Sequence, residues 1–322
     1  MVTHIAYSVV AFVLTAILGK ILIPVLKKFK IGQNERTDGP RAHLKKQGTP
    51  TMGGVMMIMT MIIITVFFSA INKDENKIQF LAASLASLGF GIIGLIDDFK
   101  KVVLKNTEGL NPKLKMFGLL IIATLYTVFL VKYLNIGTDI FIPIINYYLV
   151  LPIWIYIPFI IFVMLGATNA VNLTDGVDGL AGSVCAIMIT ALSIISIKLG
   201  YYGISLFGAT IVGCCCGFLI YNFYKAKVMM GDTGSLFLGG VISSIAIFIK
   251  QPLILIIVAI VPIIETLSVI LQVLYFKKTG NRLFRMSPLH HHFELTGWRE
   301  NKVVAVFSLV TFIASTIAVI II

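Results

Sequence analysis

The sequence predicts an all-α integral membrane protein with about ten transmembrane helices, and three observations support this fold class. Of the 322 residues, 58% are hydrophobic and only 12% are charged, whereas soluble domains carry about 25% charged residues. Mean hydropathy is +0.98. Apolar runs of about 20 residues, long enough to cross a bilayer as helices, recur along the chain. These features exclude a soluble enzyme and favour a single polytopic membrane domain over 1–322.

Ten membrane spans are expected, because each apolar run is bounded by polar or turn-forming residues. They cover 5–26, 51–71, 78–96, 116–131, 148–167, 180–197, 203–221, 236–249, 253–276 and 303–322. The apolar stretch 132–147 contains Pro143, which disfavours a helix, so a short hairpin or a re-entrant segment is expected there.

The distribution of charge predicts the orientation in the membrane and the kind of site. Most of the 26 Lys and Arg residues lie in the loops that follow odd-numbered spans, which predicts that these loops are cytoplasmic and that both termini face outward. Most acidic residues lie in the same loops. Anionic lipid alone would not explain the aspartates, and a nucleic-acid surface would not be built on short loops of a membrane bundle. A polyphosphate held by Mg²⁺ requires both signs of charge.

Two motifs carry four of the 14 acidic side chains. Asp97 and Asp98 are adjacent at the end of the third span, where their mutual repulsion requires a nearby cation. The segment 169–180, NAVNLTDGVDGL, has amides and carboxylates but no basic residue, which favours metal or nucleoside recognition. A charged helix end in the first case, and Asx turns with helix caps in the second, are the structural alternatives.

Three further motifs are polar. The sequence MGDTGS from Met230 could cradle phosphate at a helix start, or could be a simple N-cap. The run PLHHHFE from Pro288 supplies phosphate donors or a proton carrier, unless it is only a solvated loop. KKQGTPTMGG from Lys45 either contacts substrate or anchors the second span. Glu265 is a functional candidate because it lies inside the ninth span, after Pro262, although its carboxyl could simply stabilise a break there.

Taken in this order, the motifs closely resemble those of the bacterial phospho-N-acetylmuramoyl-pentapeptide transferases, within the polyprenyl-phosphate N-acetylhexosamine-1-phosphate transferase superfamily. The resemblance covers nearly the whole chain. It implies a homodimer in the bacterial plasma membrane with its active-site cleft on the cytoplasmic face, and susceptibility to nucleoside-type inhibitors. It also implies Mg²⁺-dependent reaction of UDP-N-acetylmuramoyl-pentapeptide with undecaprenyl phosphate, giving lipid I and UMP.

The resemblance also assigns residues. The catalytic positions it implies are Asp97, Asp98, Lys101, Asp232 and His290. It places Mg²⁺ on Asp232, with help from Asn172 and Asp98. The positions that it matches to substrate binding are Lys46, Thr51, Lys113, Asn172, Asp175, Asp178, Asn222, Met229, His291 and His292. Met229 departs from the family, which usually has an aromatic residue there that could stack on uracil.

Three alternatives remain open from the sequence. The lipid phosphate could attack directly, with Asp97 assisting as a base, or Asp97 or Asp98 could form a phospho-aspartate. The same chemistry could act on UDP-N-acetylglucosamine, although the histidine motif favours the muramoyl substrate. A secondary transporter is a different class, but it would carry an internal repeat and binding groups near the bilayer midplane.

Overall fold

A computed structural model of the chain describes residues 2–28, 48–102 and 109–322. Within these ranges, ten helices are long and apolar enough to cross a membrane, which confirms the predicted fold class. They are α1 Val2–Lys28, α2 Gly54–Ile71, α3 Glu75–Val102, α4 Pro112–Val128 with its continuation η2 Phe129–Tyr133, α5 Ile153–Thr174, α6 Leu180–Lys198, α7 Tyr202–Asn222, α8 Gly231–Phe248, α10 Ile260–Thr279 and α12 Glu300–Ile321. The short elements are β1 Asp139–Ile142, β2 Tyr147–Val150, η3 Pro252–Ile254, α9 Leu255–Val258 and α11 Leu289–Leu295.

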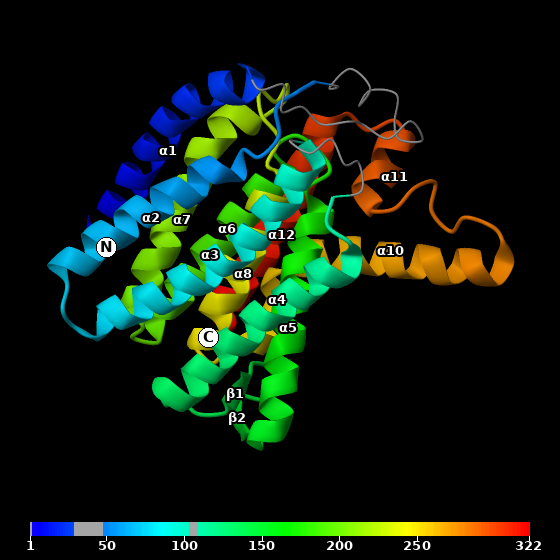
Figure 1. The fold of residues 1–322 in the computed structure, drawn as a ribbon. Coiled ribbons are helices and arrows are strands. Elements are labelled where there is room, and N and C mark those ends of the chain that lie inside the picture. The colour runs from blue at the N-terminus through cyan, green and yellow to red at the C-terminus, as the bar shows by residue number, and fades with distance from the viewer. Residues whose placement is uncertain (1, 29–47, 103–108) are drawn as a thin grey trace.

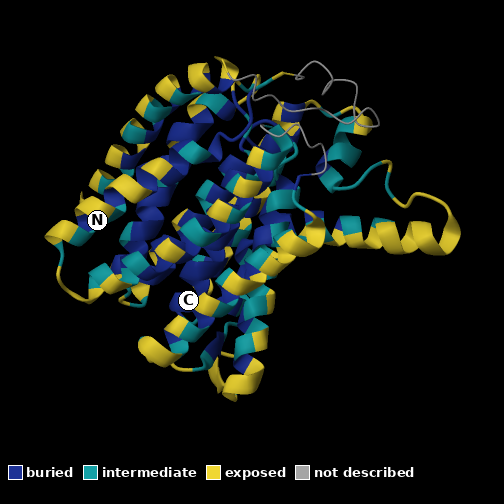
Figure 2. Cartoon of the chain, viewed as in Figure 1, coloured by how far each residue is buried: buried dark blue, intermediate teal, exposed yellow. Residues whose placement is uncertain are grey.

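Helix α8 forms the centre of the bundle (Figure 1). Every residue from Thr233 to Phe248 is buried, and the dark blue interior of Figure 2 follows this helix and the faces that surround it. Helices α2, α3, α5 and α6 all pack against α8. Its glycines and serines allow this crowding, because small residues let the backbones of membrane helices approach closely.

Three of these approaches leave no room for a side chain. A Cβ atom at Gly94 of α3 would overlap the backbone oxygen of Asp232, and one at Gly54 of α2 would overlap the backbone of Gly234. A Cβ atom at Gly239 would likewise collide with the backbone of Thr168 on α5. The glycines therefore determine how α2, α3 and α5 surround the first half of α8.

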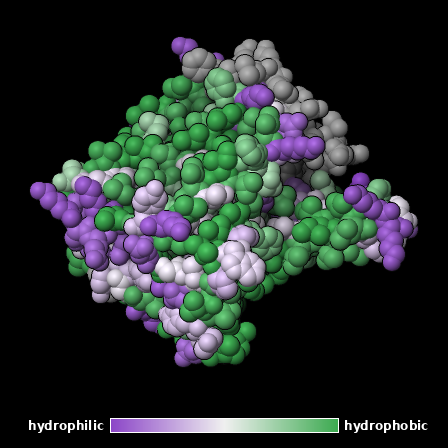
Figure 3. Space-filling view, turned by 60° about the horizontal axis from the view of Figure 1, so that its bottom comes forward, coloured by the Kyte–Doolittle hydropathy of each residue, from purple (hydrophilic) through white to green (hydrophobic). Residues whose placement is uncertain are grey.

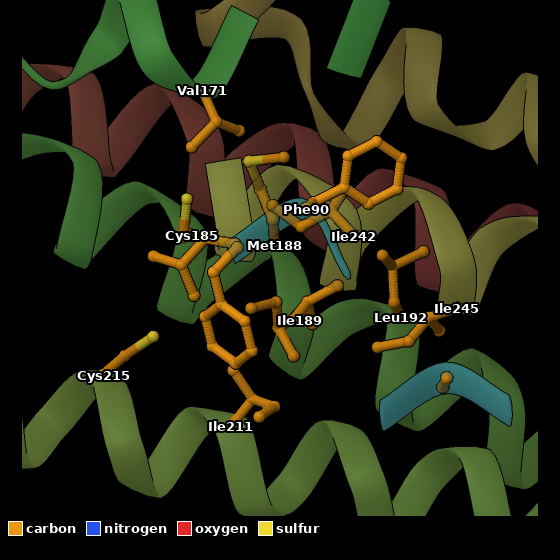
Figure 4. Close-up of a cluster of buried hydrophobic side chains, with 14 of the residues drawn as sticks. Phe90, Val171, Cys185, Met188, Ile189, Leu192, Ile211, Cys215, Ile242 and Ile245 are labelled. Carbon is orange, nitrogen blue, oxygen red and sulfur yellow. The ribbon is translucent and has the colours of Figure 1, made fainter. Parts of the chain in front are cut away.

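An apolar core lies between α3, α5, α6, α7 and α8 (Figure 4). It includes Phe90, Met188, Ile211 and the thiols of Cys185 and Cys215, all buried. All four cysteines are free, and only Cys216 is exposed.

The segment after the fourth span forms a hairpin, one of the two structures expected for it. Strands β1 and β2 pair antiparallel, with Asp139 opposite Val150. An ion pair of 2.7 Å between Lys250 Nζ and Asp139 Oδ1 ties the hairpin to the end of α8. The fifth helix begins at Ile153, after Pro152, and Tyr148 lies in β2 instead of in a membrane span.

The ninth predicted span is not one continuous helix. Residues 252–258 form two short helical turns, and the chain leaves helical geometry at Ala259 before α10 begins. Pro262, which lacks the N–H that a continuous helix would require, explains the break. Helix α10 then projects sideways from the bundle (Figure 1) and has exposed apolar side chains along much of its length.

The face of the molecule drawn in Figure 3 is largely apolar. In the space-filling view of Figure 3, hydrophobic residues cover most of the visible face, and hydrophilic residues gather in separate patches, one of them at the far end of α10. This distribution is what a protein surrounded by lipid requires.

Both chain termini lie at the same end of the bundle. His4 Nε2 is 2.7 Å from Ser205 Oγ, at the start of α7, and Lys198 Nζ donates to the Val319 oxygen near the end of α12. Gln79, near the start of α3, accepts from the Gly203 N–H at this same end. The last turns of α3, which carry Asp97 and Asp98, therefore lie at the opposite end.

The close approach of α3 to α8 should not tolerate a methyl group. We expect Gly94→Ala to destabilise the folded protein by about 1–3 kcal/mol, because the added Cβ forces the helices apart. Gly166→Ala on α5 is the matched control, since among the described residues no atom outside its own helix backbone lies within 4 Å of a Cβ built there. Thermal unfolding in detergent measures both variants, and equal melting temperatures would contradict the importance of this contact.

Candidate active site

The site is organised around the N-terminus of α8, where Asp98 of α3 accepts three hydrogen bonds. Its carboxylate receives the Asp232 N–H at 3.2 Å, the Thr233 N–H at 2.9 Å and the Thr233 hydroxyl at 2.6 Å. These bonds satisfy backbone donors that a helix start leaves without partners. Asp98 is 4% exposed, and its predicted role as a metal ligand stays a prediction.

Asp97 points away from Asp98 and joins a cluster of four charged side chains. Lys101 Nζ lies 2.7 Å from one oxygen of Asp97 and 2.7 Å from Asp232. Lys115 Nζ lies 2.7 Å from Asp232 and 3.4 Å from Asp97. The other Asp97 oxygen accepts the Leu110 N–H at 2.6 Å. The two ammonium groups therefore compensate Asp97 and Asp232, whereas Asp98 is satisfied by the donors at the start of α8.

Lys115 is the residue that sequence reasoning missed. Asn111 caps α4, and its side chain accepts the backbone N–H of Lys113. Lys113 is exposed, whereas Lys115 lies one turn before the buried Leu119 and two turns before the buried Ala123. The helical phase of this buried stripe could have selected Lys115. The structure brings Lys115, and not Lys113, to the carboxylates.

Asn172 approaches Asp232 from a third helix. Its amide donates to Asp232 Oδ1 at 2.7 Å and to the Ser235 hydroxyl at 2.8 Å. The fifth span is predicted to end at residue 167, but α5 continues to Thr174 and places Asn172 on its last turns. Only the later part of the segment 169–180 is therefore a loop. The contact of α5 with Gly239 holds this end of the helix against α8. Asp232 is thus contacted from α3, α4 and α5.

A pocket of about 280 Å³ opens beside this cluster. Its polar lining is Asp97, Lys101, Lys115 and Asn169, and its apolar lining comes mainly from α4. Carboxylates and ammonium groups next to a cavity at the end of a membrane bundle can receive a phosphorylated group and a cation together.

Asp175 follows α5 and has an unusual proton affinity. It accepts a hydrogen bond from the Gly231 backbone, but burial and the nearby charges of Asp232 and Asp98 raise its pKa to about 8. Burial disfavours the ionised form, and the neighbouring carboxylates repel it. Both effects favour the protonated form of Asp175.

Asp178 and Asn222 connect two loops. Asp178 accepts the Ala226 N–H at 3.0 Å. The Asn222 side chain accepts the Gly179 N–H at 3.0 Å and donates to the Val228 oxygen at 2.9 Å. Both side chains therefore hold the 223–230 loop against the 176–179 turn.

Thr51 precedes the second span, and Met229, from the loop before α8, binds to the backbone at the same place. The Met229 N–H donates to the Pro50 oxygen at 2.7 Å, and the Met229 oxygen accepts the Gly53 N–H at 2.9 Å. Thr51 is buried. Its hydroxyl lies next to Gly231, since a Cβ atom built on that glycine would be 2.9 Å from the hydroxyl oxygen. Lys46 lies outside the described residues.

The three histidines have different partners. His290 is buried, with its ring against Gly176 and its Nδ1 3.2 Å from Glu265. His291 Nδ1 lies 2.8 Å from Glu294, and His292 Nδ1 accepts the Arg285 N–H at 3.1 Å. His290 therefore joins the 175–178 loop, whereas His291 and His292 make these contacts within their own segment.

The residues present fit a magnesium ion. Mg²⁺ binds through one or two carboxylates together with substrate phosphates and does not need a full protein cage. Asp232 and Asp97 provide such carboxylates, with the amide of Asn172 beside them. Among the described residues, no group of three or more His, Cys, Asp or Glu side chains converges into a complete metal site.

The fold and the site define a polytopic membrane protein of the phosphosugar transferase class. The chain belongs to glycosyl transferase family 4, whose model matches residues 80–250. Three similar relatives are each named phospho-N-acetylmuramoyl-pentapeptide-transferase. That of Clostridium perfringens (strain 13 / Type A) is 47% identical and covers 96% of both chains. That of Clostridium novyi (strain NT) is 49% identical over 95% of this chain and 93% of its own. That of Halalkalibacterium halodurans is 45% identical over 97% and 95%. These relatives confirm the family predicted from the motifs.

The geometry distinguishes Lys115 from Lys113. We expect Lys115→Met to reduce turnover by about 100-fold, because it removes a charge that faces the reacting phosphates. We expect Lys113→Met to cause a much smaller loss. Steady-state release of the nucleotide product measures both variants, and a larger loss for Lys113→Met would contradict the placement of these lysines.

The raised pKa of Asp175 predicts a pH-dependent stability. The folded state holds this proton more tightly than the unfolded state, so the free energy of unfolding falls as pH rises from about 4 to about 8 and then levels off. Asp175→Asn, which mimics the protonated side chain, should remove this part of the pH dependence. Melting temperatures in EDTA between pH 5 and pH 9 measure it, and parallel curves for the two proteins would refute the assignment.

Proposed function

We propose that this protein transfers phospho-N-acetylmuramoyl-pentapeptide from UDP-N-acetylmuramoyl-pentapeptide to undecaprenyl phosphate, giving lipid I and UMP. The observation that carries the proposal is the convergence of Lys101, Lys115 and Asn172 on Asp232 at the edge of the membrane bundle. The names of relatives at 45–49% identity support the substrate pair.

The reaction must bring two anionic phosphates together. Lys101 and Lys115 lie next to the pocket, and their side chains are 37% and 18% exposed. Each ammonium group can keep one contact to a carboxylate while it binds an arriving phosphate oxygen. The lysines therefore reduce the repulsion between the donor pyrophosphate and the lipid phosphate.

Asp232 is the proposed principal ligand of Mg²⁺, with Asn172 and Asp97 or Asp98 nearby. A bound Mg²⁺ would neutralise the pyrophosphate and stabilise UMP as it leaves. Asn172 donates to one Asp232 oxygen and thereby fixes the plane of that carboxylate.

Direct attack by the lipid phosphate fits the contacts better than a phospho-aspartate intermediate. A nucleophilic carboxylate requires an accessible oxygen. Asp97 is 2% exposed and accepts bonds at both oxygens, and Asp98 accepts three bonds from α8. A lipid phosphate is largely ionised near neutral pH, with a second pKa of about 6, so direct attack needs little help from a base.

We also propose that the site faces the cytoplasm of a bacterial plasma membrane. This orientation is supported by basic residues in the last turns of α1 and α3, at the end of the bundle opposite the termini: Lys27, Lys28, Lys100 and Lys101. A homodimer and the binding of nucleoside-type inhibitors are expectations taken from the family alone.

UDP-N-acetylglucosamine is the less favoured donor, and a transporter is less favoured still. The relatives named above all carry the muramoyl name, and the histidine motif is present. The charged cluster lies at helix ends and not near the middle of the spans, where a transporter would bind its substrate.

Release of UMP by the purified protein tests the proposal. With undecaprenyl phosphate and Mg²⁺ present, we expect release from UDP-N-acetylmuramoyl-pentapeptide and not from UDP-N-acetylglucosamine. EDTA and the Asp232→Asn variant should each reduce release by at least about 100-fold, because either change removes the proposed cation contact.

The controls separate the alternatives. The melting temperature of Asp232→Asn shows whether that variant is folded. Release from UDP-N-acetylglucosamine alone would overturn the substrate assignment, and release unaffected by EDTA would overturn the metal proposal. Exchange of labelled UMP into the donor without undecaprenyl phosphate, at a rate matching turnover, would refute direct attack.

A further inference from the structure

Glu265 is an acidic residue inside an apolar helix, and the proposed reaction does not use it. It lies on α10, a candidate membrane span, and is only 1% exposed. A carboxyl group in such a place is costly unless it has a partner. The partner is His290 on α11, which is also 1% exposed.

One carboxylate contacts the same histidine twice. Glu265 Oε1 accepts the backbone N–H of His290 at 3.2 Å, and Glu265 Oε2 lies 3.2 Å from the ring nitrogen Nδ1. Contact with both the backbone and the ring fixes the side-chain torsions of His290. The contact between Oε2 and Nδ1 lies within ion-pair distance but does not meet hydrogen-bond geometry. A carboxylate this close to Nδ1 favours the proton on that nitrogen electrostatically.

The other ring nitrogen faces the acidic loop. A Cβ built at Gly176 would overlap His290 Nε2, so this atom lies directly against the backbone of the residue after Asp175. The neighbouring ring of His291 packs edge-on at 4.2 Å between centroids and limits rotation further. Among the described residues, neither ring nitrogen of His290 has a partner in hydrogen-bond geometry although both are buried, and Nε2 has no carboxylate beside it of the kind that faces Nδ1.

We propose that Glu265 is a positioning residue for the reaction: it holds the proton of His290 on Nδ1 and presents Nε2, as an acceptor, to the 175–178 loop. The proposal rests on the proposed function, since it assigns Glu265 to that same site. At metal sites, loss of a carboxylate that orients a histidine typically costs about 10–100-fold in affinity or activity, and we expect a loss of that order here.

The neighbouring His292 provides an internal comparison. Its Nδ1 accepts the Arg285 N–H, which requires the proton on Nε2. Two histidines separated by one residue are therefore assigned opposite tautomers. A spectrum that resolves the tautomers can distinguish them without any substrate.

Kinetics of Glu265→Gln are the first test. The amide can still accept the His290 backbone N–H, but its NH₂ group faces Nδ1 and favours the wrong tautomer. We expect kcat to fall about 10–100-fold with KM for the UDP-sugar changed less than about threefold, and the melting temperature to stay near that of the wild type.

A double-mutant cycle shows whether Glu265 acts through His290. We expect Glu265→Gln to have little further effect in a His290→Gln background, because the residue that it positions is gone. Additive losses in kcat would overturn the proposal, as would wild-type kcat in Glu265→Gln.

Nitrogen-15 NMR of histidine-labelled protein in detergent decides the tautomer even if the His290→Gln variant is too slow to assay. The chain has five histidines, and loss of one signal set in His290→Gln assigns that residue. We expect the proton on Nδ1 in the wild type and on Nε2 in Glu265→Gln. A wild-type proton on Nε2 overturns the proposal. A wild-type protein that releases no UMP overturns the proposed function instead, and leaves the tautomer assignment to the spectrum.

Discussion

The contact between the end of α3 and the start of α8 determines the geometry of the whole site. Gly94 lets the α3 backbone touch the carbonyl of Asp232, and Asp98, one turn later, accepts the donors at the start of α8. Successive helical residues point about 100° apart. Because Asp98 faces α8, its neighbour Asp97 must face the pocket and the two lysines. One contact therefore provides both the structural anchor and the direction of the reactive carboxylate.

Once this anchor is fixed, the charges of the site balance one another. Asp232 stands in the first turn of α8, where the helix dipole favours a negative group. Lys101 and Lys115 compensate Asp232 and Asp97 at the membrane edge, where uncompensated charge would be costly. The same ammonium groups border the pocket, so a phosphate can share contacts that already exist. The ion pairs that hold the site together therefore also place two ammonium groups where an anionic substrate can bind.

The sequence predicted the elements well and their lateral contacts less well. The ten spans follow from apolar length, and the end of α3 with its two aspartates follows from the motif. Three features could not be predicted in this way. Lys115 depends on the phase of α4, which is set by the burial of Leu119 and Ala123. The extension of α5 to Thr174 depends on packing against Gly239. The contact of Glu265 with His290 joins residues 25 apart on two helices, and no local pattern specifies such a pairing.

The break before α10 gives a structural reason for the carboxyl group of Glu265 inside an apolar span. Helix α10 leaves the bundle after Ala259, so the chain must return through 280–288 before α11 reaches the site. Apolar packing alone would hold α11 without fixing its rotation, because hydrophobic contacts are not directional. The hydrogen bond that Glu265 accepts from the His290 N–H fixes the rotation of α11 about its own axis, and the contact of the same carboxyl group with Nδ1 limits rotation of the ring. Burying a carboxyl group usually adds little stability. The pair is therefore better explained by the position that it gives to His290 than by its contribution to the free energy of unfolding.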